Sequence, residues 1–196
     1  MTNPAFPLYK HPRLRIHIFG ASGTGTTTLG RALASRWSIS HHDTDDYYWQ
    51  ARKDPFKHKR LVDERLELMK AVFLGREKWI LSGSVVSWSE LLLPYFDLAI
   101  FLSLPITERM ERIRGREVMR YGERALAPGG VRHHAHQEFM QWNASYEDQN
   151  FNGRSRQTHE DWIEHLTCPV LRLNSSVSIT TLVEHAENKV SKILSQ

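Results

Sequence analysis

Short apolar runs alternate with longer amphipathic stretches along this chain of 196 residues. The apolar runs predict five strands, at residues 14–19, 39–42, 79–81, 98–104 and 170–173. In the amphipathic stretches apolar residues recur three or four positions apart, which predicts helices. These helices are expected near residues 27–37, 59–74, 89–93, 105–121, 132–146, 154–166 and 179–193, with a loop at 122–130. Strands that alternate with helices indicate an α/β fold with a parallel sheet covered on both faces.

Length and composition fit one domain with an insertion. The chain is 40% hydrophobic, so residues 13–196 can fill a core, whereas residues 1–12 are expected to form a tail. The single Cys168 excludes an intramolecular disulfide and a zinc site built from several cysteines. The longest apolar region, 91–104, is broken by a proline and an aspartate, and the first twelve residues lack the apolar block of a secretory signal. We expect a soluble cytoplasmic protein without a membrane partner, and we predict no oligomeric state.

A glycine-rich segment separates the first expected strand from the first expected helix. Its spacing from Gly20 to Gly25 fits the phosphate-binding pattern G-x-x-x-x-G-K-[ST], except that Thr26 replaces the lysine. Glycines let several backbone N–H groups converge, and the helix N-terminus adds partial positive charge. The alternative is a plain glycine-rich turn without a ligand. We predict that the whole segment binds the phosphates of a nucleotide, through Gly20, Ala21, Ser22, Gly23, Thr24, Gly25, Thr26, Thr27 and Thr28.

An acidic run follows the second expected strand. Mg²⁺ prefers oxygen ligands and commonly takes one or two carboxylates together with phosphate oxygens and water. The Thr27 hydroxyl is the expected direct ligand, and Asp43 is the carboxylate expected to reach the metal through water. Asp45 lies on the same side of an extended chain and is the candidate to accept a proton from an acceptor hydroxyl. The alternative is that these aspartates only cap the following turn.

Aromatic residues flank this acidic run and the third strand. Tyr47, Tyr48, Trp49 and Trp88 would either stack on a substrate ring or wedge the neighbouring helices in place, and the sequence leaves both open.

Positive charge is concentrated in one part of the chain. The formal net charge is +4, and half of the arginines lie between Arg109 and Arg156. A glycine loop without its lysine leaves phosphate charge uncompensated, and arginine grips phosphate with a planar fork. We predict that an arginine-rich segment closes over the site and replaces the missing charge, with Arg116 first and then Arg120 and Arg154 in catalytic roles. Arg109 and Arg114 are expected to be solvated.

The residues after the glycine loop carry a resemblance. Residues 20–34 resemble the opening of the adenylate-kinase-like P-loop kinases, and residues 112–116, Arg-Ile-Arg-Gly-Arg, resemble the entry to their lid. The resemblance implies a three-layer P-loop NTPase sandwich with strand order 2-3-1-4-5 and a helical lid insertion at about 112–160. It also implies that Arg112 packs on adenine and that Arg116 binds phosphates. We further predict that Ser175 belongs to the nucleotide site. The chain further resembles a bacterial group of uncharacterised AAA-type proteins related to adenylate kinase, some labelled DNA topology modulation proteins, through Gly-Thr-Thr-Thr, Asp-Thr-Asp-Asp-Tyr-Tyr-Trp and Cys-Pro-Val-Leu-Arg.

Two departures from adenylate kinase bear on the acceptor. The third strand ends in Ser82-Gly83-Ser84-Val85, without the aspartate and the arginine that adenylate kinase has there. The aspartates after the second strand instead resemble those of shikimate and gluconate kinases. Both departures favour a hydroxyl acceptor over a nucleoside monophosphate.

Three functions are compatible with the sequence. The first is an ATP-dependent, Mg²⁺-requiring kinase that acts on an unidentified small molecule. The second is a nucleotide-binding regulator or slow ATPase, favoured by the missing lysine. The third, a nucleic-acid-binding protein, is the least favoured because no nucleic-acid motif is present. His133, His134 and His136 lack a second cluster with ligand spacing, so solvated lid histidines are expected rather than a metal site.

Overall fold

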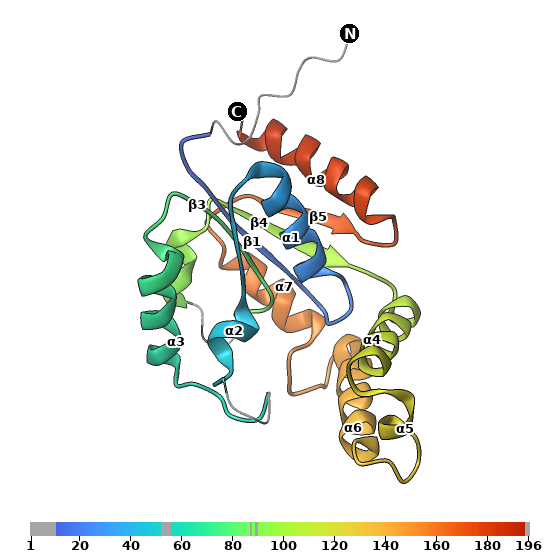
Figure 1. The fold of residues 1–196 in the computed structure, drawn as a ribbon. Coiled ribbons are helices and arrows are strands. Elements are labelled where there is room, and N and C mark those ends of the chain that lie inside the picture. The colour runs from blue at the N-terminus through green and yellow to red at the C-terminus, as the bar shows by residue number, and fades with distance from the viewer. Residues whose placement is uncertain (1–10, 52–55, 87, 89, 195–196) are drawn as a thin grey trace.

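A computed structural model describes residues 11–51, 56–86, 88 and 90–194, and its centre is a five-stranded parallel sheet (Figure 1). The strand order is β2-β3-β1-β4-β5, so the predicted 2-3-1-4-5 arrangement is confirmed. The strands are β1 (Leu14–Gly20), β2 (Ser40–Asp43), β3 (Lys78–Ser82), β4 (Leu98–Ser103) and β5 (Val170–Asn174).

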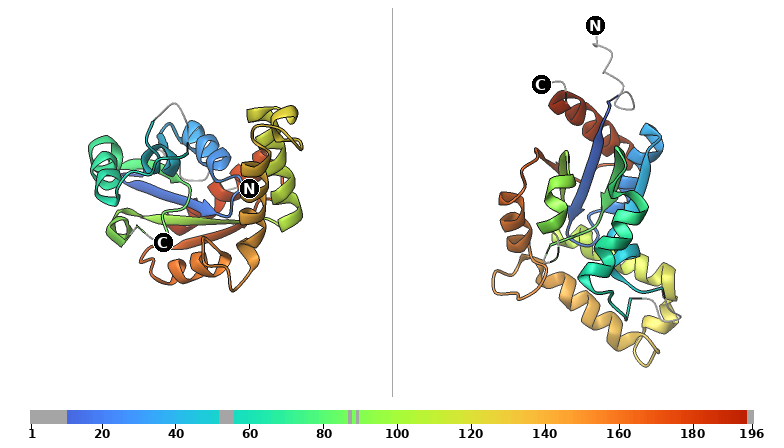
Figure 2. Two further views of the ribbon diagram at one scale, coloured as in Figure 1. Left: turned by 90° about the horizontal axis from the view of Figure 1, so that it is seen from below. Right: turned by 90° about the vertical axis from the view of Figure 1, so that its left-hand side faces the viewer.

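Helices cover both faces of the sheet, which gives the three layers seen in Figure 2. Successive side chains of a strand point to opposite faces. Ile16 and Ile18 of β1 therefore join a core with α1 (Thr26–Trp37) and α8 (Ile179–Leu194). The other core lies against the opposite face and includes Phe19 of β1. Its further elements are α3 (Val62–Met69), the π-helical η2 (Lys70–Leu74), the 3₁₀ helix η3 (Glu90–Tyr95) and α7 (Arg156–Glu164).

The register of the sheet brings the polar strand ends to one edge. Gly20 at the end of β1 lies opposite Leu102 of β4, and Asp43 at the end of β2 lies opposite Ser82 of β3. Ser103 of β4 pairs with Asn174 of β5 at the same edge. Ligands of open parallel sheets bind at this carboxyl edge, so the fold places the predicted site residues together.

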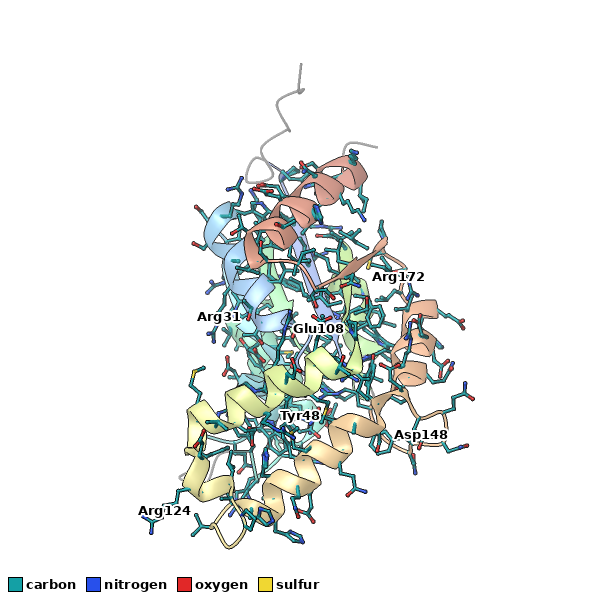
Figure 3. The ribbon with its side chains drawn as sticks, turned by 90° about the vertical axis from the view of Figure 1, so that its right-hand side faces the viewer. Arg31, Tyr48, Glu108, Arg124, Asp148 and Arg172 are labelled. Atoms are coloured by element: carbon teal, nitrogen blue, oxygen red, sulfur yellow. The ribbon has the colours of Figure 1, made fainter. Side chains whose placement is uncertain are left out.

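A group of helices projects from this edge, and we call it the lid region because it includes most of the lid predicted at about 112–160. Figure 1 shows α4, α5 and α6 together at the lower right, away from α8, and Figure 3 places Arg124 at the far tip of the lid. The helices are α4 (Ile106–Tyr121), α5 (Glu123–Leu126), α6 (His133–Ala144) and the 3₁₀ turn η4 (Ser145–Glu147). Within the part of the chain that is described, no helix has the length and apolar character needed to cross a membrane.

Two local predictions were wrong. The segment 122–130, expected to be a loop, contains the short helix α5. The acidic run after β2 is not extended, because α2 (Thr44–Tyr48) begins there. Asp43 is the N-cap of α2, and its Oδ1 accepts a hydrogen bond of 3.1 Å from the Asp45 N–H. Asp43 and Asp45 therefore do not lie on one side of an extended chain, although both stay at the same sheet edge.

Candidate active site

The glycine loop has the backbone conformation that its sequence predicts. Gly23 and Gly25 have φ values of 85° and 91°, a region that favours glycine. A Cβ on Gly20 would lie 2.4 Å from the Leu102 carbonyl oxygen, so the loop also needs a glycine where it passes β4. Thr24 Oγ1 donates to the Ala21 carbonyl at 2.8 Å and closes the turn.

The first helix begins without a side chain on its free N–H groups. Gly25 is the N-cap of α1, and within the described residues no side-chain capping bond and no acidic residue occurs in its first turn. The opening N–H groups and the positive end of the helix dipole therefore face the loop. Helix N-termini of this kind bind anions, and phosphate is the usual one. Thr26 and Thr27 are half-buried at this end, and Thr28 is exposed.

The carboxylate after β2 lies against the start of α1. Thr27 Oγ1 donates to Asp43 Oδ2 at 2.7 Å, and Ser82 Oγ donates to the same oxygen at 3.3 Å. Asp43 therefore caps α2 and contacts Thr27, so the two interpretations of this residue are not exclusive. Hydroxyl and carboxylate oxygens suit Mg²⁺. No three His, Cys, Asp or Glu side chains gather as a metal site in the described ranges, so an ion here would need phosphate or water oxygens to complete its shell.

Asp45 is the second residue of α2, and its Oδ1 accepts a hydrogen bond of 3.2 Å from Trp49 Nε1. Loss of hydration raises the pKa of Asp45, and the negative charge of Asp43 raises it further. Arg154 and, more weakly, Arg116 act in the opposite direction. A carboxylate whose pKa is raised by lost hydration and by a neighbouring charge is a candidate acid–base residue.

Arg154 lies directly on the glycine loop. Its Nη2 donates to Ser22 Oγ at 3.1 Å, and its guanidinium stacks 5.1 Å from the Trp142 ring centroid. Burial lowers the pKa of Arg154, and the charge of Asp45 partly offsets that shift. A guanidinium stays protonated at any pH the protein meets, so a fixed positive charge lies beside a loop that has no lysine.

Arg109 also contacts the loop, against expectation. Arg109 is only 1% exposed, and its Nη1 donates to the Ser22 carbonyl at 3.4 Å. Its guanidinium lies 4.8 Å from the Tyr146 ring centroid and 3.5 Å from Glu147 Oε1. The prediction that Arg109 is solvated was therefore wrong, whereas Arg114 is exposed as predicted.

The remaining predicted arginines are exposed along α4. Arg112 Nη2 donates to the Ser175 carbonyl at 3.0 Å, which brings together two residues predicted to belong to the nucleotide site. Arg116 is exposed and lies close enough to lower the pKa of Asp45. Arg120 is exposed and stacks 5.2 Å from the Phe56 ring centroid.

Aromatic residues on the β2–β3 side pack on protein groups. The Arg65 guanidinium lies 3.9 Å from the Tyr48 ring centroid and 5.1 Å from that of Trp88. Tyr47 is buried, and a hydrogen bond of 2.9 Å joins its hydroxyl to His42 Nδ1. These contacts support the interpretation that the aromatic residues hold the helices around α2 in place.

A buried polar network links the turn after β3 to the lid. His159 is buried, with Ser84 Oγ 3.0 Å from its Nε2 and the Tyr146 hydroxyl 2.8 Å from its Nδ1. Burial is the largest cause that lowers the pKa of His159 to about 3. Sequence reasoning missed this network because its three members lie far apart in the chain and have no motif spacing.

The lid histidines do not form a metal site within the described residues. His134 is 86% exposed and pairs with Glu138, as expected for a solvated histidine. His133 is half-buried and donates from Nδ1 to the Leu126 carbonyl at 2.9 Å, and His136 is half-buried 3.8 Å from Glu117. The prediction of solvated side chains thus holds for one of the three.

Over 176 residues the chain is 43% identical to "Uncharacterized protein YqaC" of Bacillus subtilis (strain 168), a match that covers 90% of this chain and 97% of that protein. The chain belongs to the YqaC family. No protein-family model matches it.

Solved structures confirm the P-loop kinase fold of this YqaC-family chain. A shikimate kinase from Bacteroides thetaiotaomicron has a TM-score of 0.51 at 16% identity, covering 93% of this chain and 99% of that one. A gluconokinase from Sinorhizobium meliloti 1021 has a TM-score of 0.52 at 15% identity, covering 94% and 97%. At these identities the likeness establishes the fold alone. The label of DNA topology modulation protein stays a prediction for the YqaC family.

Proposed function

We propose that this protein is an ATP-dependent phosphotransferase that moves the γ-phosphoryl group of ATP to the hydroxyl of a small-molecule acceptor. The observation that carries the proposal is the 2.7 Å contact between Thr27 Oγ1 and Asp43 Oδ2. It joins the helix that follows the glycine loop to the carboxylate that follows β2. Oxygen ligands, free helix N–H groups and a fixed guanidinium at this edge of the sheet support the proposal, because phosphoryl transfer uses such groups.

Each group has a role in this proposal. The N–H groups of the glycine loop and of α1 hold the phosphates, and Arg112 and Ser175 border the base. Thr27 and Asp43 hold Mg²⁺, which supplies charge neutralisation on the phosphate oxygens when it is bound. Arg154 stabilises the negative charge that Thr26 leaves uncompensated.

The acceptor side is proposed in the same terms. Asp45 accepts the proton of the acceptor hydroxyl, since its raised pKa brings its basicity nearer to that of a working general base. Arg116 and Arg120 are exposed on α4 and complete the charge around the transferred group when the lid closes. The acceptor itself is a small hydroxyl compound. Nucleic acid is the less favoured partner.

A second function is favoured by one observation, the neutral Thr26 in place of the loop lysine. A site with reduced positive charge binds triphosphate more weakly, which suits a nucleotide-binding regulator or a slow ATPase. The contact of Arg154 with Ser22 favours the phosphotransferase, because it returns a cation to the same loop.

The test is a screen of the purified full-length chain with ATP, Mg²⁺ and a panel of hydroxyl-bearing metabolites. ADP release is recorded, and each phosphorylated product is identified by mass spectrometry. We expect one class of acceptor to raise ADP release well above basal hydrolysis, and Gly25→Val to abolish it. Phosphoryl transfer to water alone, unchanged by any acceptor, would support the slow ATPase instead. Failure of millimolar ATP and Mg²⁺ to raise the melting temperature would exclude both functions.

A further inference from the structure

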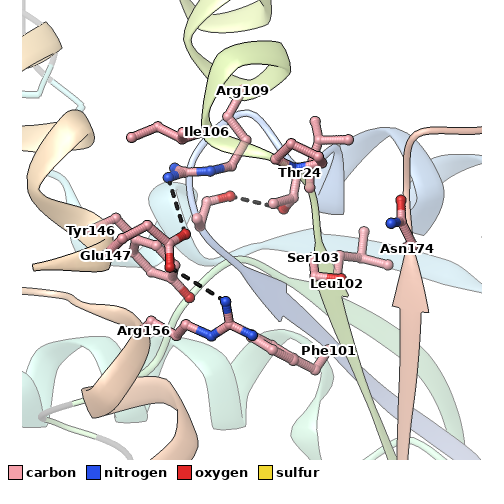
Figure 4. A pocket seen from close by; sticks show the side chains of 13 residues that line it. Thr24, Phe101, Leu102, Ser103, Ile106, Arg109, Tyr146, Glu147, Arg156 and Asn174 are labelled. Carbon is pink, nitrogen blue, oxygen red and sulfur yellow. Dashed lines mark hydrogen bonds and ion pairs between the residues drawn. The ribbon is translucent and has the colours of Figure 1, made fainter.

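A cavity of about 450 Å³ lies behind the glycine loop, between the loop, the start of α4 and the turn η4 (Figure 4). Ala21 and Thr24 of the loop line it, whereas Gly25, Thr26 and Arg112 do not. It is therefore adjacent to the proposed nucleotide site, with which it shares only Ala21 and Thr24 of the loop. Its size falls within the range of small-molecule pockets.

One wall of the cavity is a buried positive charge. Arg109 points into the cavity in Figure 4 and is 1% exposed. Within the described residues its Nε has no hydrogen-bond acceptor, and its Nη2 has only the 3.5 Å ion pair with Glu147. A buried guanidinium with unfilled donors is costly unless an anion completes its bonding.

The charges of the cavity do not balance. Glu147 lies between two guanidinium groups, with Oε1 3.5 Å from Arg109 Nη2 and Oε2 3.4 Å from Arg156 Nη1. Two guanidinium groups therefore share one carboxylate, so the side chains that line the cavity carry one net positive charge. A monoanion would balance it, and the planar fork of arginine matches a carboxylate.

The rest of the wall is mostly apolar. Phe101 and Leu102 of β4 form the floor, and Leu104, Pro105 and Ile106 lead from the strand into α4. An inorganic anion would leave this apolar surface unused, whereas an organic one would cover it. We propose that this cavity binds a small carboxylate with an apolar body, held by Arg109 and Arg156.

The cavity is connected to the glycine loop through Arg109. This side chain contacts the cavity and also donates to the Ser22 carbonyl, while Arg154 binds the hydroxyl of the same Ser22. A carboxylate that draws Arg109 toward the cavity weakens its hold on the loop. Carboxylate and nucleotide should therefore change each other's affinity by the same factor. This coupling rests on the proposed nucleotide site, whereas the carboxylate site itself does not.

The test uses three probes at millimolar concentration with the ¹⁵N-labelled full-length chain. Benzoate carries a carboxylate and an apolar ring, benzamide is its neutral counterpart, and inorganic phosphate is an anion without an apolar part. We expect benzoate to shift the amide signals of Thr24, Ser103 and Asn174 in a saturable way. Benzamide and phosphate should bind there at least tenfold more weakly, and ATP should change the benzoate affinity.

Variants locate the site. Arg156→Gln should weaken benzoate about tenfold, the loss of one charge-assisted bond, and Ile106→Trp should block the cavity without touching either arginine. Arg114→Gln removes an exposed arginine of α4 that does not line the cavity, so it is the control and should change nothing. The proposal is overturned if benzamide binds as well as benzoate, if phosphate matches it, or if the shifts centre on Gly25 and Thr26. Benzoate binding that persists without any effect of ATP would retain the carboxylate site and contradict only the coupling.

Discussion

The arginines of the lid region fall into two groups with opposite environments. Arg109 and Arg154 are held against Ser22 of the glycine loop, and burial lowers the pKa of both. Arg116 and Arg120 are exposed on α4. The first group lies fixed beside the loop before any ligand arrives, whereas the second can reach it only by movement of side chains or of the lid. A lysine lost from the loop can therefore be replaced by a cation that the fold has already positioned.

One arginine of each group affects Asp45, since Arg154 and Arg116 both lower its pKa. If Asp45 is the general base, Asp45→Asn should lower kcat by about 10²–10⁴-fold with little change in ATP affinity. Steady-state kinetics with the acceptor found by the screen and calorimetry with ATP would measure the two effects. Asp46→Asn, on the next residue, is the control and should retain most of the activity. Equal losses in both variants would assign these carboxylates a structural role.

The raised pKa of Asp45 also predicts how activity depends on pH. Asp45 must be ionised to accept a proton, and its pKa is raised, so activity should fall with decreasing pH earlier than for an ordinary aspartate. A pH profile of kcat whose acidic limb disappears in Asp45→Asn would agree with this. A limb that is unchanged in the variant would assign it to another group.

Arg154→Gln compared with Arg120→Gln separates the two groups of arginines directly. Loss of a charge-assisted contact at the loop is worth about 1.5–3 kcal/mol, or roughly 10–100-fold in ATP affinity. Arg120 is exposed and contacts Phe56, so its variant should cost less than about threefold in ATP affinity. Isothermal titration calorimetry gives both values, and the melting temperature without ligand monitors folding. Comparable losses of ATP affinity in the two variants would contradict the distinction between arginines held against Ser22 and exposed arginines.

Acid should lower the stability of the fold through its buried histidines, because a buried histidine gains a proton as the pH falls whereas a buried arginine is already protonated. His17 is fully buried, its Nε2–H donates to the Gly83 carbonyl at 2.8 Å, and burial lowers its pKa from 6.5 to about 4. Because the pKa of His17 is lower in the folded than in the unfolded state, neutral His17 contributes fully to the free energy of unfolding above pH 6.5. That contribution is lost as the pH falls toward 4. Between pH 6.5 and roughly 5.5 the loss should be about 1 kcal/mol for this residue.

Urea unfolding at several pH values measures that loss. His17→Phe should reduce the pH dependence, whereas His134→Gln, which removes an exposed histidine, should leave it unchanged. If the free energy of unfolding has the same pH dependence in wild type and His17→Phe, the pKa of His17 is not lowered by folding.

The sheet and the glycine loop were predictable because their signals are local and repeated. Each strand is a short apolar run, and the spacing from Gly20 to Gly25 needs no tertiary contact to be seen. The helix α2 was missed because five residues, Thr-Asp-Asp-Tyr-Tyr, are too few to show a helical period. The helix α5 has only four residues and is hidden for the same reason.

Burial of Arg109 could not be predicted from the pattern of α4. The buried residues of that helix are Arg109, Ile113 and Glu117, four positions apart, so its inward face carries two charges. Hydrophobic periodicity predicts that charged residues face solvent. Arg109 and Glu117 are buried because Glu147 and His136, from η4 and α6, pack against them. The link of Arg154 to Ser22 joins residues 132 positions apart and is likewise a product of the tertiary fold.

The central claim is that Arg154 supplies the positive charge that Thr26 does not. Its most direct measurement is a double-mutant cycle of ATP affinity with wild type, Thr26→Lys, Arg154→Gln and the double variant. The account predicts that Arg154→Gln weakens ATP by roughly 10–100-fold, and that Thr26→Lys restores most of this loss in the double variant while adding less to wild type. Arg116→Gln in the same assay tests the exposed group and should show less rescue. Strict additivity of the two changes, with ATP affinity intact in Arg154→Gln, would contradict the claim.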